Sequence, residues 1–255
     1  MRPSTEVQSV QGTESGSRTF LFRLLRIPRD VLAYDLFRVL RLYCRGDVLD
    51  VGGGDFYLLA KRKGVQCETW TAVEPVKDKL LKLDDPKFSC IHADGCHMPE
   101  VANNRYDTVL NIQVLEHVFE PIKMVEECAR VMKAGGHGIF LIPQTSYMHM
   151  APHHYYNFTR FWIEEAMERS HLEIIELKLL GGLWSSMVMH HLFFFLESFR
   201  FPGFSIPTIK RSPLFHLLWP FMAMYAVIAI PICFVLSLAD LKEAANNHLV
   251  VVRKR

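Results

Sequence analysis

The feature that most constrains the fold is an alternation of short apolar strand patterns with helix patterns, which begins at Asp47. Strand patterns occupy 47–51, 69–74, 88–92, 106–111, 137–142, 172–179 and 248–253. Helix patterns occupy 55–63, 76–84, 120–133 and 159–169. Strands that alternate with helices form βαβ units. We therefore predict an α/β protein with a mostly parallel sheet, covered on both faces, whose ligands bind at the carboxyl ends of the strands.

Composition excludes several other classes of protein. The chain has 255 residues, of which 50% are hydrophobic and 22% are charged, so it is neither disordered nor too short for a large core. Its net charge of +2 provides no general attraction for nucleic acid. The six cysteines form no C-x-x-C pair, so we expect reduced thiols and no metal site.

The residues before the first strand pattern divide into two parts. Residues 1–18 are rich in Ser, Thr, Gln and Gly, which predicts a disordered tail and no secretory signal. Residues 19–45 mix apolar residues with arginines, and Pro28 divides them into two basic amphipathic helices. Such helices either lie on an anionic membrane or cover the sheet, and we favour the second role.

A glycine-rich loop follows the first strand pattern, which ends in Asp50-Val51-Gly52-Gly53-Gly54. Glycines permit a tight turn and a close approach of the backbone to a ligand. A dinucleotide-binding fingerprint needs Gly or Ala where this chain has the bulky Tyr57. Asp50 would also repel a pyrophosphate. The loop therefore disfavours a nicotinamide-dependent oxidoreductase.

Acidic residues follow successive strand patterns. Glu74 lies about 24 residues after Asp50, the spacing at which an acid binds ribose hydroxyls. Asp94 follows the third strand pattern, and Glu116 comes shortly after the fourth. Any one of them could be a helix N-cap, but that role does not explain the whole set. A crevice lined by acids suits a nucleoside that carries a cationic group and no phosphate, and S-adenosylmethionine fits this description.

Several stretches resemble class I S-adenosylmethionine-dependent methyltransferases, particularly the type 11 group of quinone-biosynthesis and polysaccharide-pathway enzymes. They are VLDVGGGDF, AVEP, ADG, YDTVLNIQVLEHVFEP and VEECARVMKAGGHGIFLIP. The resemblance covers about 46–180 and the last strand. It implies a Rossmann-like seven-stranded sheet with an antiparallel last strand, and S-adenosylmethionine as cofactor. Together with Asp50, the implied cofactor-binding residues are Gly52, Gly53, Gly54, Glu74, Pro75, Asp94, Gly95, Asn111, Ile112 and Gln113. Phe56 departs from the small residue usual in the family.

Three histidines are candidates for the acceptor side of the site. Methyl transfer needs alignment of the acceptor with the methyl group, and a hydroxyl acceptor also gains from a nearby base. We expect this role from His117, His153 or His154, unless they are only a wall of the cleft. The run 152–159 is similar to a His-Asp-Tyr-Tyr-Arg-Phe-Thr string of polysaccharide-pathway methyltransferases. His153 matches it, whereas His154 replaces the acid and Asn157 the arginine.

An apolar insertion at 181–246 separates the sixth and last strand patterns. Within it, 212–239 contains no Asp, Glu, Lys or Arg and is long enough to span a bilayer. A single crossing would separate the last strand from its sheet, and Pro220 and Pro231 interrupt a straight helix. We therefore expect an even number of crossings or a shallow hairpin in one leaflet. The alternative is a buried cap or a homodimer interface.

These patterns together predict four regions: a tail at 1–18, basic helices at 19–45, a methyltransferase domain at 46–180 plus 247–255, and the insertion at 181–246. The predicted function is O-methylation of an amphiphilic or lipid-linked acceptor, such as a glycan on a polyprenyl carrier or a quinone-like ring. We expect a peripheral or monotopic protein on the cytoplasmic face of a membrane. The alternative is a catalytically degenerate scaffold that assembles through its apolar segments.

Overall fold

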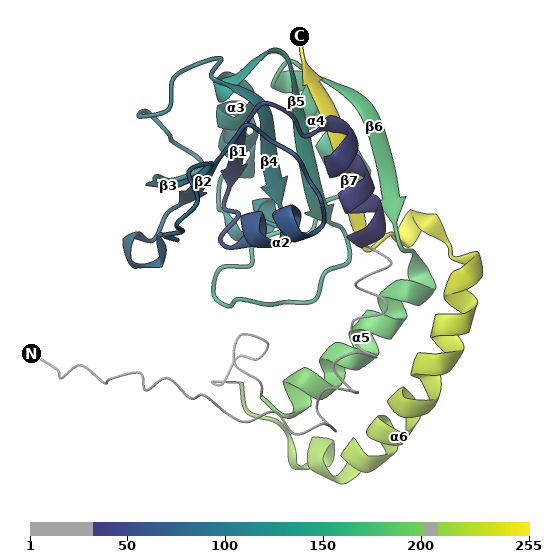
Figure 1. The fold of residues 1–255 in the computed structure, drawn as a ribbon. Helices are drawn as coiled ribbons and strands as arrows, with labels where there is room; N and C mark the ends of the chain where they lie inside the picture. The colour runs from purple at the N-terminus through teal and green to yellow at the C-terminus, as the bar shows by residue number, and fades with distance from the viewer. Residues whose placement is uncertain (1–32, 201–208) are drawn as a thin grey trace, which may run out of the picture.

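A seven-stranded sheet forms the centre of the computed structural model, which describes residues 33–200 and 209–255 (Figure 1). The strands are β1 (Asp47–Val51), β2 (Thr69–Glu74), β3 (Phe88–His92), β4 (Tyr106–Ile112), β5 (Met132–Pro143), β6 (Leu172–Leu180) and β7 (Asn247–Lys254). Their order is β3-β2-β1-β4-β5-β7-β6, and β7 is antiparallel to both of its neighbours. The strand pairs between β3 and β5 are parallel. The predicted α/β sheet with an antiparallel last strand is confirmed.

Helices cover both faces of this sheet. The helix at 33–43 and α2 (Phe56–Arg62) pack on one face, and α3 (Pro121–Val131) and α4 (Arg160–Arg169) pack on the other. Each face has its own hydrophobic core. Along β1, Val48 packs in the core under the helix at 33–43 and α2, and Leu49 packs in the core under α3 and α4, because successive strand residues point to opposite faces.

The helix at 33–43 is the described part of the basic region at 19–45. Leu36 and Leu40 are buried against the sheet, and Arg38 pairs with Glu176 of β6. This helix therefore covers the sheet, as favoured from the sequence. The predicted tail at 1–18 and the first of the two basic helices lie outside the described residues.

The helix predicted at 76–84 is wrong. This segment contains only a 3-10 turn, η1 (Lys77–Lys79), and extended chain. The connection must return along the full height of the sheet, about 17–20 Å for an ordinary strand. A helix over 76–84 would advance only about 14 Å, so an extended path is required.

Two helices form a hairpin between β6 and β7: α5 (Leu183–Ser198) and α6 (Pro213–Leu236). Figure 1 shows them side by side, projecting from the edge of the sheet at which β4 and β6 end. Two 3-10 turns, η3 (Ser237–Ala239) and η4 (Lys242–Ala244), return the chain to β7 at the same edge. Asp240 closes the base of the hairpin, because its carboxylate accepts from the amides of Trp184 and Ser185 at 2.7 and 3.1 Å. The α6 helix continues through Pro220 and Pro231 and curves.

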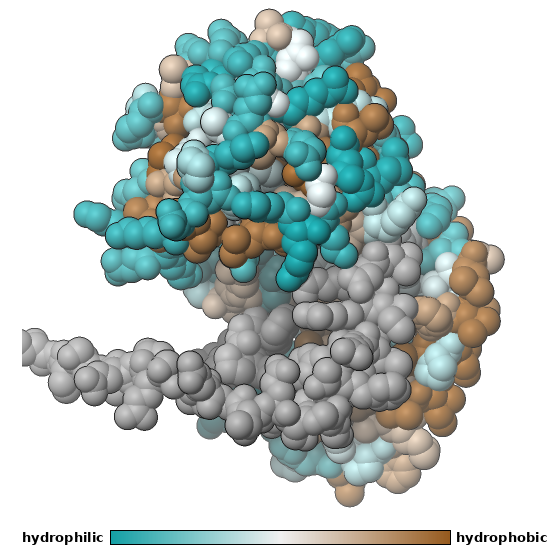
Figure 2. All heavy atoms as spheres, viewed as in Figure 1, coloured by the Kyte–Doolittle hydropathy of each residue, from teal (hydrophilic) through white to brown (hydrophobic). Residues whose placement is uncertain are grey.

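The surface of α6 is unusually apolar. Most of its large apolar side chains are exposed, and they appear as a brown band over the hairpin in Figure 2. The segment Pro213–Ala239 is the one helix among the described residues that is long and apolar enough to cross a membrane, and only 17% of its most apolar window is buried. These features alone are weak support for a span, since core helices of soluble proteins have similar length and composition.

Candidate functional site

The glycine loop after β1 lies directly over a buried carboxyl group. Gly52 and Gly54 have φ values of +77° and +51°, which glycine adopts without strain. A Cβ atom on Gly53 would lie 1.8 Å from Oδ2 of Asp50, so no other residue fits there without movement of the loop or of Asp50. The backbone of the loop is therefore packed closely on Asp50 and open on its outer side.

Asp50 is fully buried and poorly satisfied. Neither carboxylate oxygen makes a hydrogen bond of ordinary geometry within the described part of the chain. Burial raises the pKa of Asp50 to about 7, and the Trp70 indole offsets only part of this effect. A buried carboxylate without a partner is costly. Its position beneath the glycine loop suits a ligand that brings positive charge to this edge of the sheet.

Two further acids lie at the carboxyl ends of β2 and β3. Glu74 accepts a hydrogen bond from the amide of Val76 through Oε1 at 2.9 Å. Asp94 accepts from the amide of Cys96 through Oδ1 at 2.9 Å. Each of these bonds uses one oxygen, so the second oxygen of each carboxylate can still accept hydroxyl or amine hydrogens of a ligand. Pro75 is exposed beside them.

The remaining predicted cofactor residues occupy different environments. Gly95 is packed so closely that a Cβ atom there would lie 2.7 Å from Cε of Met124. Asn111 is buried and donates to Sδ of Met124 at 3.1 Å, so its amide points into the core under α3. Ile112 and Gln113 are half-buried at the edge. Of these three residues, Ile112 lines a pocket together with Gly53 of the glycine loop.

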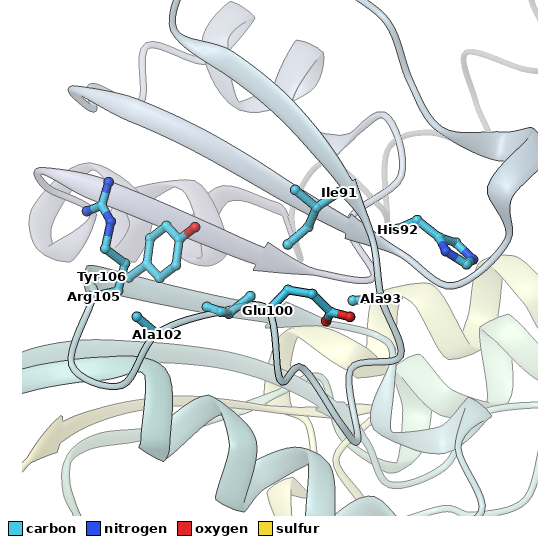
Figure 3. A pocket seen from close by; sticks show the side chains of 8 residues that line it. Ile91, His92, Ala93, Glu100, Ala102, Arg105 and Tyr106 are labelled. Atoms are coloured by element: carbon cyan, nitrogen blue, oxygen red, sulfur yellow. The ribbon is translucent and has the colours of Figure 1, made fainter.

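Two surface pockets lie beside the sheet. One, of about 330 Å³, opens beside the glycine loop and is lined by Gly53, Asp55, Phe56, Leu59, Arg62 and Ile112. A larger one, of about 480 Å³, lies between the end of β3 and the start of β4 (Figure 3) and contains none of the predicted site residues. This second pocket opens where no helix connects β3 to β4 over 93–105.

A cluster of histidines lies beside a buried glutamate after the end of β4. Glu116 and His117 lie in η2 (Leu115–His117), directly after β4, and His149 and His154 lie in the loop after β5. The ring centroids of His117 and His149 are 4.8 Å apart, and those of His149 and His154 are 4.7 Å apart. His153 is exposed and lies outside this ring cluster, next to Tyr155.

Hydrogen bonds to the backbone determine which ring nitrogens carry protons. Nδ1 of His117 donates to the carbonyl of His153 at 2.5 Å, and Nδ1 of His149 donates to the carbonyl of Tyr147 at 2.8 Å. Because a carbonyl can only accept, both neutral rings have a free lone pair on Nε2. In His154 the proton is on the other ring nitrogen, Nε2, because Nδ1 accepts a hydrogen bond from the amide of His149 at 3.2 Å.

Burial shifts the titration of the whole cluster toward neutral side chains. Burial lowers the pKa of His117, of His149 and of His154, and it raises the pKa of Glu116 to about 7. His117 and His149 can thus act as lone-pair donors at neutral pH. His154 is less suited to accept a proton, because its free nitrogen is the protonated one.

Sequence reasoning named His117, His153 and His154 but missed His149 and gave Glu116 no role among the acceptor-side residues. His149 lies in a Met-His-Met run without a motif, and only the path of the loop brings it to His117. The amide of Tyr155 donates to the carbonyl of Glu116 at 2.8 Å, which fixes this loop on η2. The sequence signal available was the Glu-His pair directly after a strand.

Comparisons with known proteins agree with this arrangement. A family model described as a methyltransferase domain matches residues 49–140. An uncharacterized methyltransferase of Mycobacteroides abscessus is 32% identical over 96 residues, which cover 35% of this chain and 36% of that protein. The match thus spans about a third of the length of that curated relative.

Solved structures share the fold over most of the chain. A methyltransferase of Archaeoglobus fulgidus described as S-adenosylmethionine-dependent has a TM-score of 0.54 at 13% identity, with 94% of this chain and all of that chain (100%) covered. A Haloferax volcanii protein, solved with a methyltransferase activator, has a TM-score of 0.55 at 14% identity, with 87% of each chain covered. Residues 49–140 therefore match a methyltransferase domain, and the chain has the fold of solved structures described as S-adenosylmethionine-dependent methyltransferases.

Proposed function

We propose that this protein is an S-adenosylmethionine-dependent methyltransferase that methylates a hydroxyl group of an amphiphilic acceptor at a membrane surface. The proposal rests on a contact between two parts of the chain. The loop after β5 that carries His149 and His154, which we call the histidine loop, touches the apolar hairpin formed by α5 and α6. Tyr147 of the loop donates to Glu197 of α5, and its ring stacks on Phe193 with centroids 5.1 Å apart. A polar acceptor group beside the histidines would thus have its apolar part next to α5 and α6.

The geometry of the hairpin supports membrane association without a crossing by β7. Both ends of the hairpin return to the carboxyl edge of the sheet, so the strand that follows stays with its neighbours. The α6 helix is about 36 Å long and α5 about 24 Å, compared with about 30 Å for the hydrocarbon core. An apolar surface of this size, uncovered by the described residues, requires some partner.

The carboxyl edge of the sheet suits S-adenosylmethionine by charge. The ligand carries a sulfonium and an ammonium group, and this edge has the accessible carboxylates of Glu74 and Asp94 and, beneath the glycine loop, the buried carboxyl group of Asp50. We assign the methionine portion to the glycine loop and Ile112, the ribose hydroxyls to Glu74, and the adenine edge to Asp94, with Pro75 and Gly95 adjoining it. Charge-assisted hydrogen bonds of this kind contribute about 1.5–3 kcal/mol each.

The transfer itself is an in-line displacement. A lone pair of the acceptor oxygen forms a bond to the methyl carbon, the carbon–sulfur bond breaks, and its electron pair stays on sulfur as the neutral thioether of S-adenosylhomocysteine. The hydroxyl proton must leave, and the free Nε2 atoms of His117 and His149 lie on the acceptor side. The protein mainly aligns the two reactants.

The proposal includes the arrangement of the chain on the membrane. Residues 46–180 plus 247–255 form the catalytic unit, and 181–246 form the membrane unit on the cytoplasmic face. Two other occupants of the apolar surface are a second copy of the chain, which makes a homodimer, and the partners of a non-catalytic scaffold. Binding of S-adenosylmethionine distinguishes an enzyme from a scaffold, and the oligomeric state in detergent-free buffer distinguishes a dimer interface from a membrane surface.

The decisive experiment incubates the purified full chain with lipid extracts and S-adenosylmethionine that carries a deuterated methyl group. Mass spectrometry of the chloroform-soluble fraction should show a new product heavier by one labelled methyl group. A matched incubation with the Glu74→Ala variant, at a cofactor concentration near the wild-type dissociation constant, should give much less of this product. Label that appears only in water-soluble molecules would contradict the amphiphilic acceptor, and a chain that does not bind the cofactor would contradict the enzyme itself.

A further inference from the structure

We propose that Glu116, His117 and His149 form a binding site for one divalent first-row transition metal ion of the zinc type. This inference deepens the proposed function, because it gives the histidine cluster a defined task toward the acceptor. Binding of the ion does not itself depend on methyl transfer. The donor atoms of the three side chains all lie within 4.8 Å of one another.

The first argument is the state of Glu116. Its side chain is fully buried, and neither carboxylate oxygen has a hydrogen-bond partner among the described residues. The nearest candidate is Nε2 of His117, 3.8 Å from Oε1, which is too far for a hydrogen bond. A buried carboxylate in this state is costly unless it is paired or coordinates a metal. A cation between Glu116 and the two rings would satisfy it.

The second argument is the orientation of the two rings. Metal-ligating histidines almost always donate their second ring N–H to a carbonyl or a carboxylate, which fixes the ring and its tautomer. His117 and His149 both do so through Nδ1, to two different backbone carbonyls. Both rings therefore present the unprotonated Nε2 that a metal requires. His154 does not, because its Nδ1 is already occupied by the amide of His149.

Ligand type indicates the kind of ion. Two imidazoles and one carboxylate are typical of zinc and of other first-row transition metals, whereas magnesium prefers oxygen ligands. Zinc–nitrogen bonds of about 2.0–2.1 Å place tetrahedral ligands about 3.3 Å apart, so the most distant donors here must approach by about 1.5 Å. Rotation of side chains on η2 and on the loop can supply a movement of this size. Three protein ligands leave a coordination position open.

The position of the site suggests what the ion does. It adjoins the acceptor side of the crevice, and an ion with an open coordination position attracts a hydroxyl oxygen and lowers the pKa of that hydroxyl. The proton can then leave to water, so neither histidine has to accept it. On this assignment His117 and His149 are ligands, and the lone pairs described above are used for the ion.

The test measures metal binding directly. Tag-free full-length protein is treated with a chelator and titrated with Co²⁺, and the visible absorption of the coordinated ion is recorded, followed by displacement with Zn²⁺. We expect one ion per chain. Glu116→Gln and His149→Ala should each weaken binding at least about 100-fold, because even outer-shell changes cost 10–100-fold. The matched control is His153→Ala, which removes an imidazole of the same loop but keeps the carbonyl that accepts from His117.

Binding of S-adenosylmethionine to each variant shows whether it is folded, and His149→Ala, on a loop, remains informative if Glu116→Gln does not fold. The inference is overturned if wild-type protein gives no stoichiometric Co²⁺ spectrum, or if His153→Ala weakens binding as much as His149→Ala. Protein that binds S-adenosylmethionine but no Co²⁺ refutes the metal site alone. Protein that binds Co²⁺ but no S-adenosylmethionine refutes the proposed enzyme and keeps the site.

Discussion

Four exposed side chains along one face of α6 allow a direct test of membrane binding. Leu217, Phe221, Met224 and Ile228 are 69, 64, 59 and 54% exposed. Their spacing of three and four residues places them on one face of the helix. We consider a variant in which all four are replaced by glutamine, because glutamine has a helix propensity close to those of leucine and methionine and should preserve α6.

The expected effect follows from these exposures. Complete burial of one such side chain contributes about 1.5–3 kcal/mol. Somewhat more than half of each side chain is available to lipid, so the four together contribute about 4–7 kcal/mol to the free energy of membrane binding. This corresponds to a loss of at least about 1,000-fold in the partition coefficient. Basic residues near the tip of the hairpin, such as Lys210 and Arg211, add only about 1 kcal/mol each to the free energy of binding to a membrane of anionic lipid.

The assay is sedimentation with vesicles of neutral phosphatidylcholine at low and high salt. Wild-type protein should bind at both salt concentrations and be released by detergent, and the fourfold variant should stay in the supernatant. The control is Phe161→Gln, which removes a 79% exposed aromatic ring from α4, away from the hairpin. Equal binding of the fourfold variant and wild type would refute this reasoning. A wild-type chain that ignores vesicles and forms a dimer disrupted by the four substitutions would identify the face as a dimer interface.

Three further predictions concern the crevice. Glu74→Ala should weaken S-adenosylmethionine binding at least about tenfold in calorimetry, by loss of a charge-assisted bond of about 1.5–3 kcal/mol; unchanged affinity would contradict the ribose assignment. Because burial raises the pKa of Asp50 to about 7, the folded state keeps a proton that the unfolded state releases near pH 4, so this group costs stability as pH rises from about 4 to about 7. Asp50→Asn should remove about 3 kcal/mol of this dependence between pH 5 and 8, as measured by urea unfolding, and parallel curves for the two proteins would argue against it. His117→Ala should lower turnover by about 10²–10⁴ while cofactor affinity is kept, and His153→Ala by less than about tenfold; the reverse ranking would return the acceptor role to His153.

The strands could be predicted from the sequence because local pattern and tertiary environment agree there. In β7, Leu249 and Val251 pack in one core while Val250 and Val252 pack in the other, so a continuous apolar run is required. The prediction of a helix at 76–84 was wrong because this segment, despite its helix-like composition, must connect two strands across the height of the sheet. The distance that it has to span, rather than its helix propensity, determined its conformation.

The conformation of the glycine loop was predictable for a similar reason. Gly53 packs so closely on Asp50 that a residue with a Cβ atom would not fit without movement, and the sequence accordingly has glycine there. The histidine cluster was only partly predictable. His153 and His154 are adjacent in sequence, yet only the second reaches the cluster, because the backbone of this loop turns one ring inward and the other outward. The position of His149 depends on the path of the same loop, and no periodic sequence pattern predicts that path.

The placement of β7 has a consequence for the order of assembly. This strand follows the hairpin in the chain but lies between β5 and β6 in the sheet. During synthesis β6 therefore emerges without a neighbour, and it stays unpaired until α5 and α6 have been made. The apolar hairpin is thus available to a bilayer while the domain is still open, and β7 closes the sheet afterwards. If the hairpin binds a membrane as proposed, it can attach before the fold is complete, and β7 then completes the sheet.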